Sequence, residues 1–208
     1  YQINLAIAGI AVSTVSLPVL AKAIKNKSIK LITKIQNKSI ELCLLLSLPA
    51  GIGLIFASDE IVNSLFGYGS FNEENIKLTA SALKYFGYGV PAFSLIKIMS
   101  NLFFARDNTT TPFKISFFVV IINISISLIY FKEVGFLIIP IATSISTWAG
   151  VLIYIFILNS KNYLVIEVNT YINLIKITFA TFVMTILLIF LLNFLSENFV
   201  YNSYIKIL

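Results

Sequence analysis

Long apolar runs without a charged residue constrain this chain more than any other feature of its sequence. Residues 1–21 contain no charged side chain, and similar runs recur along the 208 residues, separated by short segments that hold most of the charges. An α-helix needs about 20 such residues to cross the hydrocarbon core of a bilayer, which is about 30 Å thick. Strands of a membrane barrel need far shorter runs. The sequence therefore predicts an all-α, polytopic membrane helical bundle.

The composition excludes several other classes of protein. Hydrophobic residues make up 58% of the chain and charged residues only 12%, which excludes a soluble globular domain and a disordered chain. The chain has no histidine and one cysteine, Cys43, so it has neither a histidine-based active site nor a cysteine metal cluster. A phosphate loop and a Ser/His/Asp set are also absent from the sequence. We therefore expect neither an enzyme nor a nucleic-acid partner, since the net charge of +6 comes from segments between apolar runs.

The apolar runs divide the chain into two predicted regions: a bundle of about five spans over residues 1–158, and a C-terminal helix pair, cut short, over residues 159–208. The predicted spans are 1–21, 40–58, 79–105, 113–131 and 134–158 in the bundle, and 172–196 and the partial run 199–208 in the pair. Apolar residues begin at Tyr1 without a Met, and the last run stops at Leu208. We expect the chain to be a piece of a longer protein.

Basic residues favour every other segment between the spans. The positive-inside rule places the basic segments in the cytoplasm and the others outside. The basic segments are 22–38, 106–114 and 161–176, and the others are 59–78, 132–133 and 197–198. The segment 22–38 has two interpretations: an amphipathic surface helix whose lysines meet anionic membrane lipids, or a solvated basic loop.

Local signals support two helix starts. Asn72 precedes Glu73 and Glu74, as an N-cap followed by acids that suit the positive end of a helix dipole. Thr111 and Pro112 suit the first turn of the fourth span. Four prolines lie inside apolar runs: Pro18, Pro49, Pro91 and Pro140. Each is expected to kink its helix, and the kinks either line a cavity or are tolerated in a packed bundle.

A lysine inside the third span is the most informative single residue. Lys97 shares one helical face with Ser94 and Asn101, at i, i+3 and i+7 spacing. A charged side chain inside the membrane-spanning part of a helix raises the free energy of membrane insertion by a few kcal/mol. One interpretation is a polar stripe that faces a water-filled cavity and suits an anionic substrate. The other is a lysine that extends to the cytoplasmic headgroups.

Small polar residues in the next two spans also have two interpretations. Asn123 lies in the fourth span and Thr143 in the fifth. Such residues are ordinary contacts between membrane helices. Their oxygens also suit a hard cation such as Na⁺.

Several stretches resemble the MurJ (MviN) family. Residues 48–51 with 64–71 look like its "LPA…LFxxGxF" segment, and residues 103–112 resemble its "FYARxDTKTP" loop. The opening Tyr1-Gln2, followed by residues 16–18, is similar to a helix of that family. The cytoplasmic loop motif here consists of Arg106, Asp107, Thr111, Pro112 and Lys114. Asn108 stands where the family has Asp, and Thr110 stands where it has Lys.

The resemblance implies a lipid II flippase of the MOP transporter superfamily in the bacterial cytoplasmic (inner) membrane. Members have 14 helices, in two six-helix lobes around a cationic cavity, with a final pair that forms a lipid-tail groove. This chain resembles the second, MATE-like lobe with helix thirteen and part of fourteen, so the N-terminal lobe would be a missing partner. Some members bind Na⁺, and Asn123 and Thr143 match two of those positions, whereas Ser127 stands where such members have Asp.

We therefore expect a transporter that moves lipid II, an undecaprenyl-pyrophosphate-linked peptidoglycan precursor, to the periplasmic leaflet by alternating access. The expected substrate path holds Lys97, Asn101, Ser94 and Arg106, and the only expected cofactor is Na⁺ at Asn123 and Thr143. The alternatives are a flippase for another polyprenyl-linked glycan, a non-transporting scaffold or inactive gene fragment, and an integral-membrane glycosyltransferase.

Overall fold

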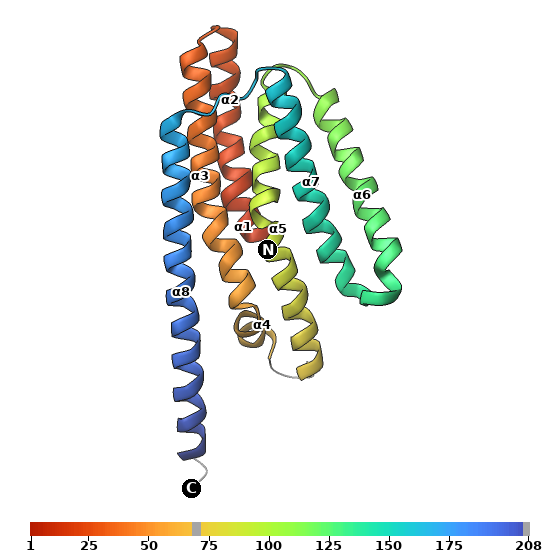
Figure 1. The fold of residues 1–208 in the computed structure, drawn as a ribbon, viewed down its shortest axis with the longest axis vertical. Helices are drawn as coiled ribbons and strands as arrows, with labels where there is room; N and C mark the ends of the chain where they lie inside the picture. The colour runs from red at the N-terminus through yellow and green to blue at the C-terminus, as the bar shows by residue number, and fades with distance from the viewer. Residues whose placement is uncertain (68–71, 206–208) are drawn as a thin grey trace.

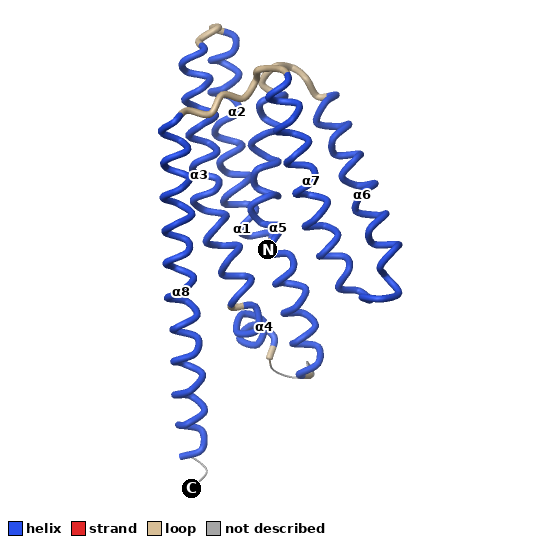
Figure 2. The backbone as a smooth tube through the Cα atoms, in the orientation of Figure 1, coloured by secondary structure: helices blue, strands red, loops and turns tan. Residues whose placement is uncertain are grey.

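A computed structural model describes residues 1–67 and 72–205, with side chains up to residue 194. Residues 68–71, which end one family-like segment, and residues 206–208, which end the last apolar run, lie outside the described residues. Every regular element in the described part is a helix, as Figure 2 shows. The elements are α1 (Gln2–Leu5), the π-helical η1 (Ala6–Ala11), α2 (Val12–Lys25), α3 (Ile29–Phe56), α4 (Ser58–Phe66), α5 (Glu73–Phe104), α6 (Thr110–Val134), the 3-10 turn η2 (Gly135–Leu137), α7 (Ile138–Ser160) and α8 (Val168–Ile205).

The long helices run up and down side by side, so the connections collect at two ends of the bundle (Figure 1). The α2–α3 turn, the α5–α6 loop and the α7–α8 linker lie at one end, which we call the lysine-rich end. The α6–α7 turn and the short helix α4 lie at the other end. The segments that the charge pattern places on one side of a membrane therefore meet at one end of the molecule.

Within the described residues, four helical stretches are long and apolar enough to cross a membrane by length and composition: Gln2–Lys25, Ile29–Phe56, Thr110–Ser160 and Val168–Phe194. The third contains both α6 and α7, joined by η2. The fold is thus the helical membrane bundle that the sequence predicts.

Helix α5 lies at the centre and packs most extensively against α3 and α7. At the crossing with α3, a Cβ added to Gly51 would lie 2.9 Å from the carbonyl oxygen of Gly87. A Cβ on Gly87 would in turn lie 3.0 Å from the Gly51 carbonyl oxygen. Small residues let membrane helices approach closely enough for dense van der Waals packing, because apolar burial gives little driving force inside lipid.

Three helices that enter the lysine-rich end stop in the same way. A residue two or three positions past the end of α2, α5 and α7 has a positive φ: Lys27, Asp107 and Asn162, with φ of 51°, 56° and 53°. The next N–H reaches back to a carbonyl five residues earlier, as Asn108 does to Phe103 at 3.1 Å. This left-handed cap satisfies carbonyls that a helix end leaves unpaired, and it turns the chain sharply.

The structure corrects the expectation for segment 22–38. It is neither a surface helix nor a loop, because α2 continues to Lys25 and α3 begins at Ile29. Only a three-residue turn, 26–28, interrupts the two helices, and it closes through the cap at Lys27. The basic segment is therefore a helical hairpin whose tip lies at the lysine-rich end (Figure 1).

Helix α8 also differs from its expected form. It runs without interruption over Val168–Ile205, where the sequence suggests a break between residues 196 and 199. The residues at that point are Ser196, Glu197 and Asn198, without the glycine or proline that commonly ends a helix. The division of the chain into a bundle and a C-terminal pair stays a prediction.

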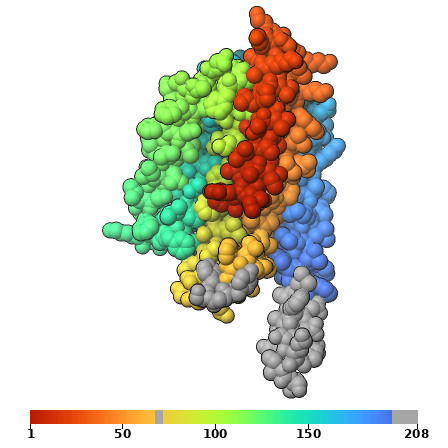
Figure 3. All heavy atoms as spheres, turned by 180° about the vertical axis from the view of Figure 1, so that it is seen from behind, coloured from red at the N-terminus to blue at the C-terminus, as the bar shows by residue number. Residues whose placement is uncertain are grey.

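Two helices lie at the edges of the bundle. Helix α6 packs mainly on α7, and the helix contacts of α8 within the described residues are with α3. Figure 3 shows the opposite face, with α2 across the middle, α6 on one side and α8 on the other. Both edge helices expose large apolar side chains, including Phe113 and Leu128 on α6 and Ile175 and Phe179 on α8.

Candidate functional site

The polar stripe of α5 divides between the protein interior and the exposed surface. Ser94 and Asn101 are buried, whereas Lys97 is exposed. The Asn101 amide donates to the Ser13 carbonyl at 2.7 Å, and the Ser13 hydroxyl donates to the Lys97 carbonyl at 3.3 Å. Ser94 and Asn101 therefore face η1 and α2, and Lys97 is the member of the stripe that a solute can reach.

The π-helical segment η1 approaches α5 beside this stripe. A Cβ added to Gly9 would lie 3.0 Å from the Cα atom of Ser94 and 3.5 Å from Cγ of Lys97. The Ser94 hydroxyl has no hydrogen-bond partner among the described residues. Single π-helical turns are rare and occur often at functional sites. The contact fixes the backbone that carries Lys97, while the place of Lys97 on a substrate path stays a prediction.

The family-like loop at the lysine-rich end is held by its own polar residues. Asp107 takes the left-handed conformation, and Asn108 accepts a hydrogen bond from the Thr111 N–H at 3.0 Å. Asn and Asp accept such hydrogen bonds at helix starts about equally well, so Asn108 can replace the Asp that the family carries at this position. Pro112 is buried in the first turn of α6, and Lys114 is exposed.

Arg106 contacts an aromatic ring from a distant part of the chain. Its guanidinium carbon lies 4.1 Å from the centroid of the Tyr163 ring, in the linker between α7 and α8. The same guanidinium donates to the carbonyl of Leu102, one turn back on α5. Burial lowers the pKa of the Arg106 guanidinium from its ordinary value, but arginine keeps its charge in proteins. The contact is therefore a cation–π interaction, and the role of Arg106 on the substrate path stays a prediction.

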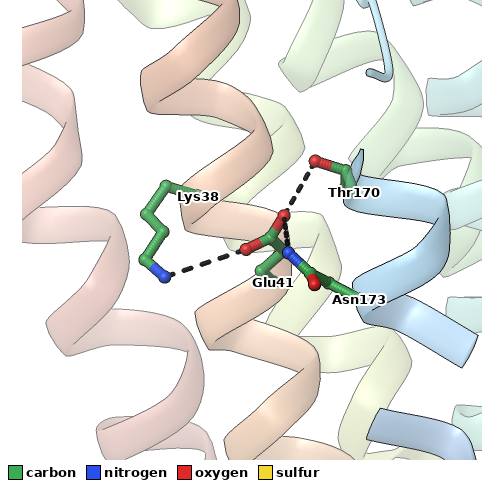
Figure 4. A network of polar contacts seen from close by, with 4 residues as sticks. All are labelled: Lys38, Glu41, Thr170 and Asn173. Carbon is green, nitrogen blue, oxygen red and sulfur yellow. Dashed lines mark hydrogen bonds and ion pairs between the residues drawn. The ribbon is translucent and has the colours of Figure 1, made fainter. Parts of the chain in front are cut away.

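A partly buried acid joins α3 to α8 (Figure 4). Glu41 Oε1 accepts hydrogen bonds from the Thr170 hydroxyl at 2.8 Å and from the Asn173 amide at 3.2 Å. Lys38 Nζ lies 3.8 Å from Glu41 Oε2. The Glu41 side chain is 13% exposed and the Lys38 side chain 66%, so the hydrogen bonds are more sheltered from water than the ion pair.

Sequence reasoning missed Glu41, although a signal was present. Glu41 is the only acidic residue among the first 58. It also continues the i, i+4 spacing of Thr33 and Asn37, which are both buried. Polar residues at i and i+4 on one face of a membrane helix indicate a polar contact with a neighbour.

The structure brings Asn123 and Thr143 together. The Asn123 amide nitrogen donates to the Thr143 hydroxyl at 3.0 Å and lies 3.4 Å from the Ser146 hydroxyl. This is an interhelical hydrogen bond between α6 and α7. No cluster of three or more His, Cys, Asp or Glu able to hold a metal occurs in the searched, described residues. With an amide nitrogen facing the hydroxyls, this arrangement gives no support to Na⁺ binding, which stays a prediction.

Comparison with known proteins identifies a family and several relatives that this chain resembles. A family model described as "Lipid II flippase MurJ" matches residues 1–208. The "Probable lipid II flippase MurJ" of Rhizobium tropici is 37% identical over 167 residues, covering 80% of this chain and 31% of the relative. That of Rickettsia prowazekii is 34% identical over 207 residues, covering 100% of this chain and 41% of the relative.

A solved structure supports the fold. The chain matches "Lipid II flippase MurJ, inward closed conformation" with a TM-score of 0.79 and 24% identity, over 90% of this chain and 38% of the other. The chain thus spans between about a third and two fifths of the length of these relatives.

Proposed function

The chain belongs to the MurJ family, and from that premise we propose that it forms the second lobe of a flippase that carries lipid II across the inner membrane. The family match over residues 1–208 is the observation that carries this proposal. Since the chain spans 41% or less of the relatives compared above, transport as a whole would require an N-terminal lobe as partner. Members of this family are transporters, and we propose that this chain catalyses no chemical reaction.

The proposed mechanism is alternating access. The pyrophosphate of lipid II carries charge that does not cross hydrocarbon unaided. Lys97, exposed on α5 and placed by the contact between Gly9 and Ser94, supplies a cation to an inward-facing cavity. Rocking of one lobe against the other then exposes the headgroup on the periplasmic side. The membrane potential or an ion gradient supplies the energy, since one charge moved through 100 mV gives about 2.3 kcal/mol.

The test uses bacteria depleted of their own lipid II flippase. They would express the full-length gene, and lipid II exposed on the outer face would be measured. We expect exposure to be restored, and to be lost with Lys97→Gln. The matched control is Lys84→Gln, another exposed lysine on α5.

The other outcomes separate the alternatives. Restored exposure that survives Lys97→Gln removes this lysine from the mechanism. No restoration by a protein that inserts normally in the membrane contradicts the lipid II proposal. Outward movement of a different polyprenyl-linked glycan in the same cells would then identify another carrier substrate, and its absence would favour a scaffold or an inactive fragment.

A further inference from the structure

The linker between α7 and α8, residues 161–167, lies across the lysine-rich end of the bundle, and we call it the strap. It begins with a turn at Lys161 and Asn162 and continues over residues 163–167 without regular secondary structure. Leu164 is buried and Ile166 packs against the core, while Val165 and Glu167 between and after them are exposed. Alternation with a period of two is the pattern of a β-strand with one buried face. Residues 164–167 of the strap have this pattern, and no strand lies beside them among the described residues.

Two neighbouring amides of α3 take the place of the missing strand. Gln36, oriented to satisfy both of its amide groups, donates to the Tyr163 carbonyl at 3.0 Å and accepts from the Val165 N–H at 3.1 Å. Asn37 donates to the Val165 carbonyl at 2.8 Å and accepts from the Glu167 N–H at 3.2 Å. Together the amides pair four consecutive polar groups along one edge of the strap. Unpaired backbone groups away from water are costly, so these bonds fix the register of the strap on α3.

Tyr163 ties the same segment to α5. Its ring contacts the Arg106 guanidinium, whose carbon lies 4.1 Å from the ring centroid, and the ring of Phe103, whose centroid is 6.0 Å away in an edge-on arrangement. Phe103 is fully buried in the core. The family-like loop and the strap therefore share one contact, although they are about 57 residues apart in sequence.

Glu41 extends this attachment into the first two turns of α8, through Thr170 and Asn173 (Figure 4). Farther along α8, Thr181 is buried, but most of the large apolar side chains up to Phe194 are exposed. The sheltered polar contacts of α8 thus concentrate where it leaves the strap.

We propose that the strap fixes the lysine-rich end of α8 to the bundle, with Tyr163 and Glu41 as positioning residues, and that Arg106 acts through Tyr163 rather than by touching the substrate. The end of α8 near the strap then moves with α3 and α5 as one body. The transport consequence rests on the proposed function, whereas the attachment of α8 does not.

The attachment is tested by pulsed electron paramagnetic resonance on the full-length protein in lipid nanodiscs. Spin labels replace the exposed residues Lys34 on α3 and Lys176 on α8, in a background where Cys43 is changed to Ala. The native distance distribution should be narrow. Tyr163→Leu should broaden it, while Tyr163→Phe, which keeps the ring, and the control Tyr130→Leu on α6 should not.

A narrow, unchanged distribution in folded Tyr163→Leu protein would overturn the strap. If that variant does not fold, Asn37→Ala is measured in its place, because it removes the hydrogen bonds to Val165 and Glu167. It should broaden the distance distribution in the same way, and an unchanged distribution would overturn the proposal. Neither result depends on what the protein transports.

The role of Arg106 is tested by a double-mutant cycle on the initial rate of lipid II flipping. We expect Arg106→Gln and Tyr163→Leu each to lower the rate by about tenfold, and the double variant to be no slower than the slower single variant. Losses that multiply would show that Arg106 acts independently of Tyr163, and would overturn this part of the proposal. Absence of lipid II flipping by the native protein would contradict the proposed function and leave the distance measurement to judge the strap.

Discussion

Two faces of helix α3 use opposite chemistry to hold their neighbours. On the face toward α5, the backbones meet at Gly51 and Gly87, with a carbonyl where a Cβ would otherwise lie. On the face toward α8, side chains span the gap, with Glu41 and Asn37 bonded to α8 and to the strap. Close glycine packing therefore joins α3 to α5 where lipid tails give little hydrophobic driving force for association. Polar side chains join α3 to α8 and the strap near the lysine-rich end of the bundle.

The glycine contact should be the most sensitive to change. Gly51→Val should destabilise the protein by about 3 kcal/mol, because its Cβ meets the backbone of α5, which has little room to move. Gly53→Val is the matched control, since nothing lies within 4 Å of a Cβ at that position. Thermal unfolding can be followed with a thiol-reactive dye. Cys43, the only cysteine of the 208 residues, is 0% exposed in the folded protein and reacts with the dye when the core opens. Equal unfolding temperatures for the two variants would contradict the close-contact explanation.

The polar bridge should be the next most sensitive. Glu41→Leu should cost about 2 kcal/mol, because the Thr170 hydroxyl and the Asn173 amide lose a shared, charged acceptor. Glu41→Gln keeps an acceptor oxygen and should lose less. Glu133→Leu, at an exposed acid of α6, serves as the control in the same thermal assay. A loss no larger than that of Glu133→Leu would mean that packing alone holds α8.

A third contact, between α6 and α7, should have a smaller effect. Asn123→Leu removes the hydrogen bond to Thr143, and single bonds between membrane helices contribute about 0.6 kcal/mol on average. Combining it with Thr143→Val should add little, because both changes remove the same bond. A loss of several kcal/mol, reduced by removing Na⁺ from the buffer, would instead indicate a cation at this site.

The remaining expected change, of similar size, is a gain in stability. Lys27 has a φ of 51°, a conformation that glycine adopts without strain, so Lys27→Gly should stabilise the protein by about 0.5–1 kcal/mol. Two residues earlier, Lys25→Gly changes the last helical residue of α2, where glycine should destabilise the helix by about 0.5–1 kcal/mol. Opposite shifts in unfolding temperature would confirm the cap, and shifts of the same sign would contradict it.

The sequence predicts the features that follow from membrane insertion and from local residue preferences. The helical bundle follows from the length of the apolar runs, and the Asn72 cap, with Oδ1 2.9 Å from the Asn75 nitrogen, follows from local residue preferences. For Asn123 and Thr143 the sequence leaves two interpretations open, interhelical contacts or Na⁺ ligands; the two residues bond to each other, and Na⁺ binding stays a prediction.

Contacts between distant segments could not be predicted in this way. Asn37 and Val165 are 128 residues apart, and no local pattern links them. The helical face shared by Lys97, Ser94 and Asn101 is real, but only the packing of η1 and α2 decides which members are buried. Helix α4 has nine residues and lies almost entirely in segment 59–78, for which the charge pattern predicts only a connection outside the membrane.

The π-helical segment Ala6–Ala11 has a consequence for how this chain tolerates deletions. Each turn of a π-helix holds an additional residue relative to an α-helix. Removing one residue from η1 should therefore leave a regular α-helix whose flanking side chains keep their directions. Removing one residue from α2 instead rotates everything before it by about 100° relative to the rest. Gly9 itself must stay, because its contact with Ser94 leaves no room for a side chain. A deletion scan along the first 25 residues should thus show a narrow window of tolerance on either side of that glycine.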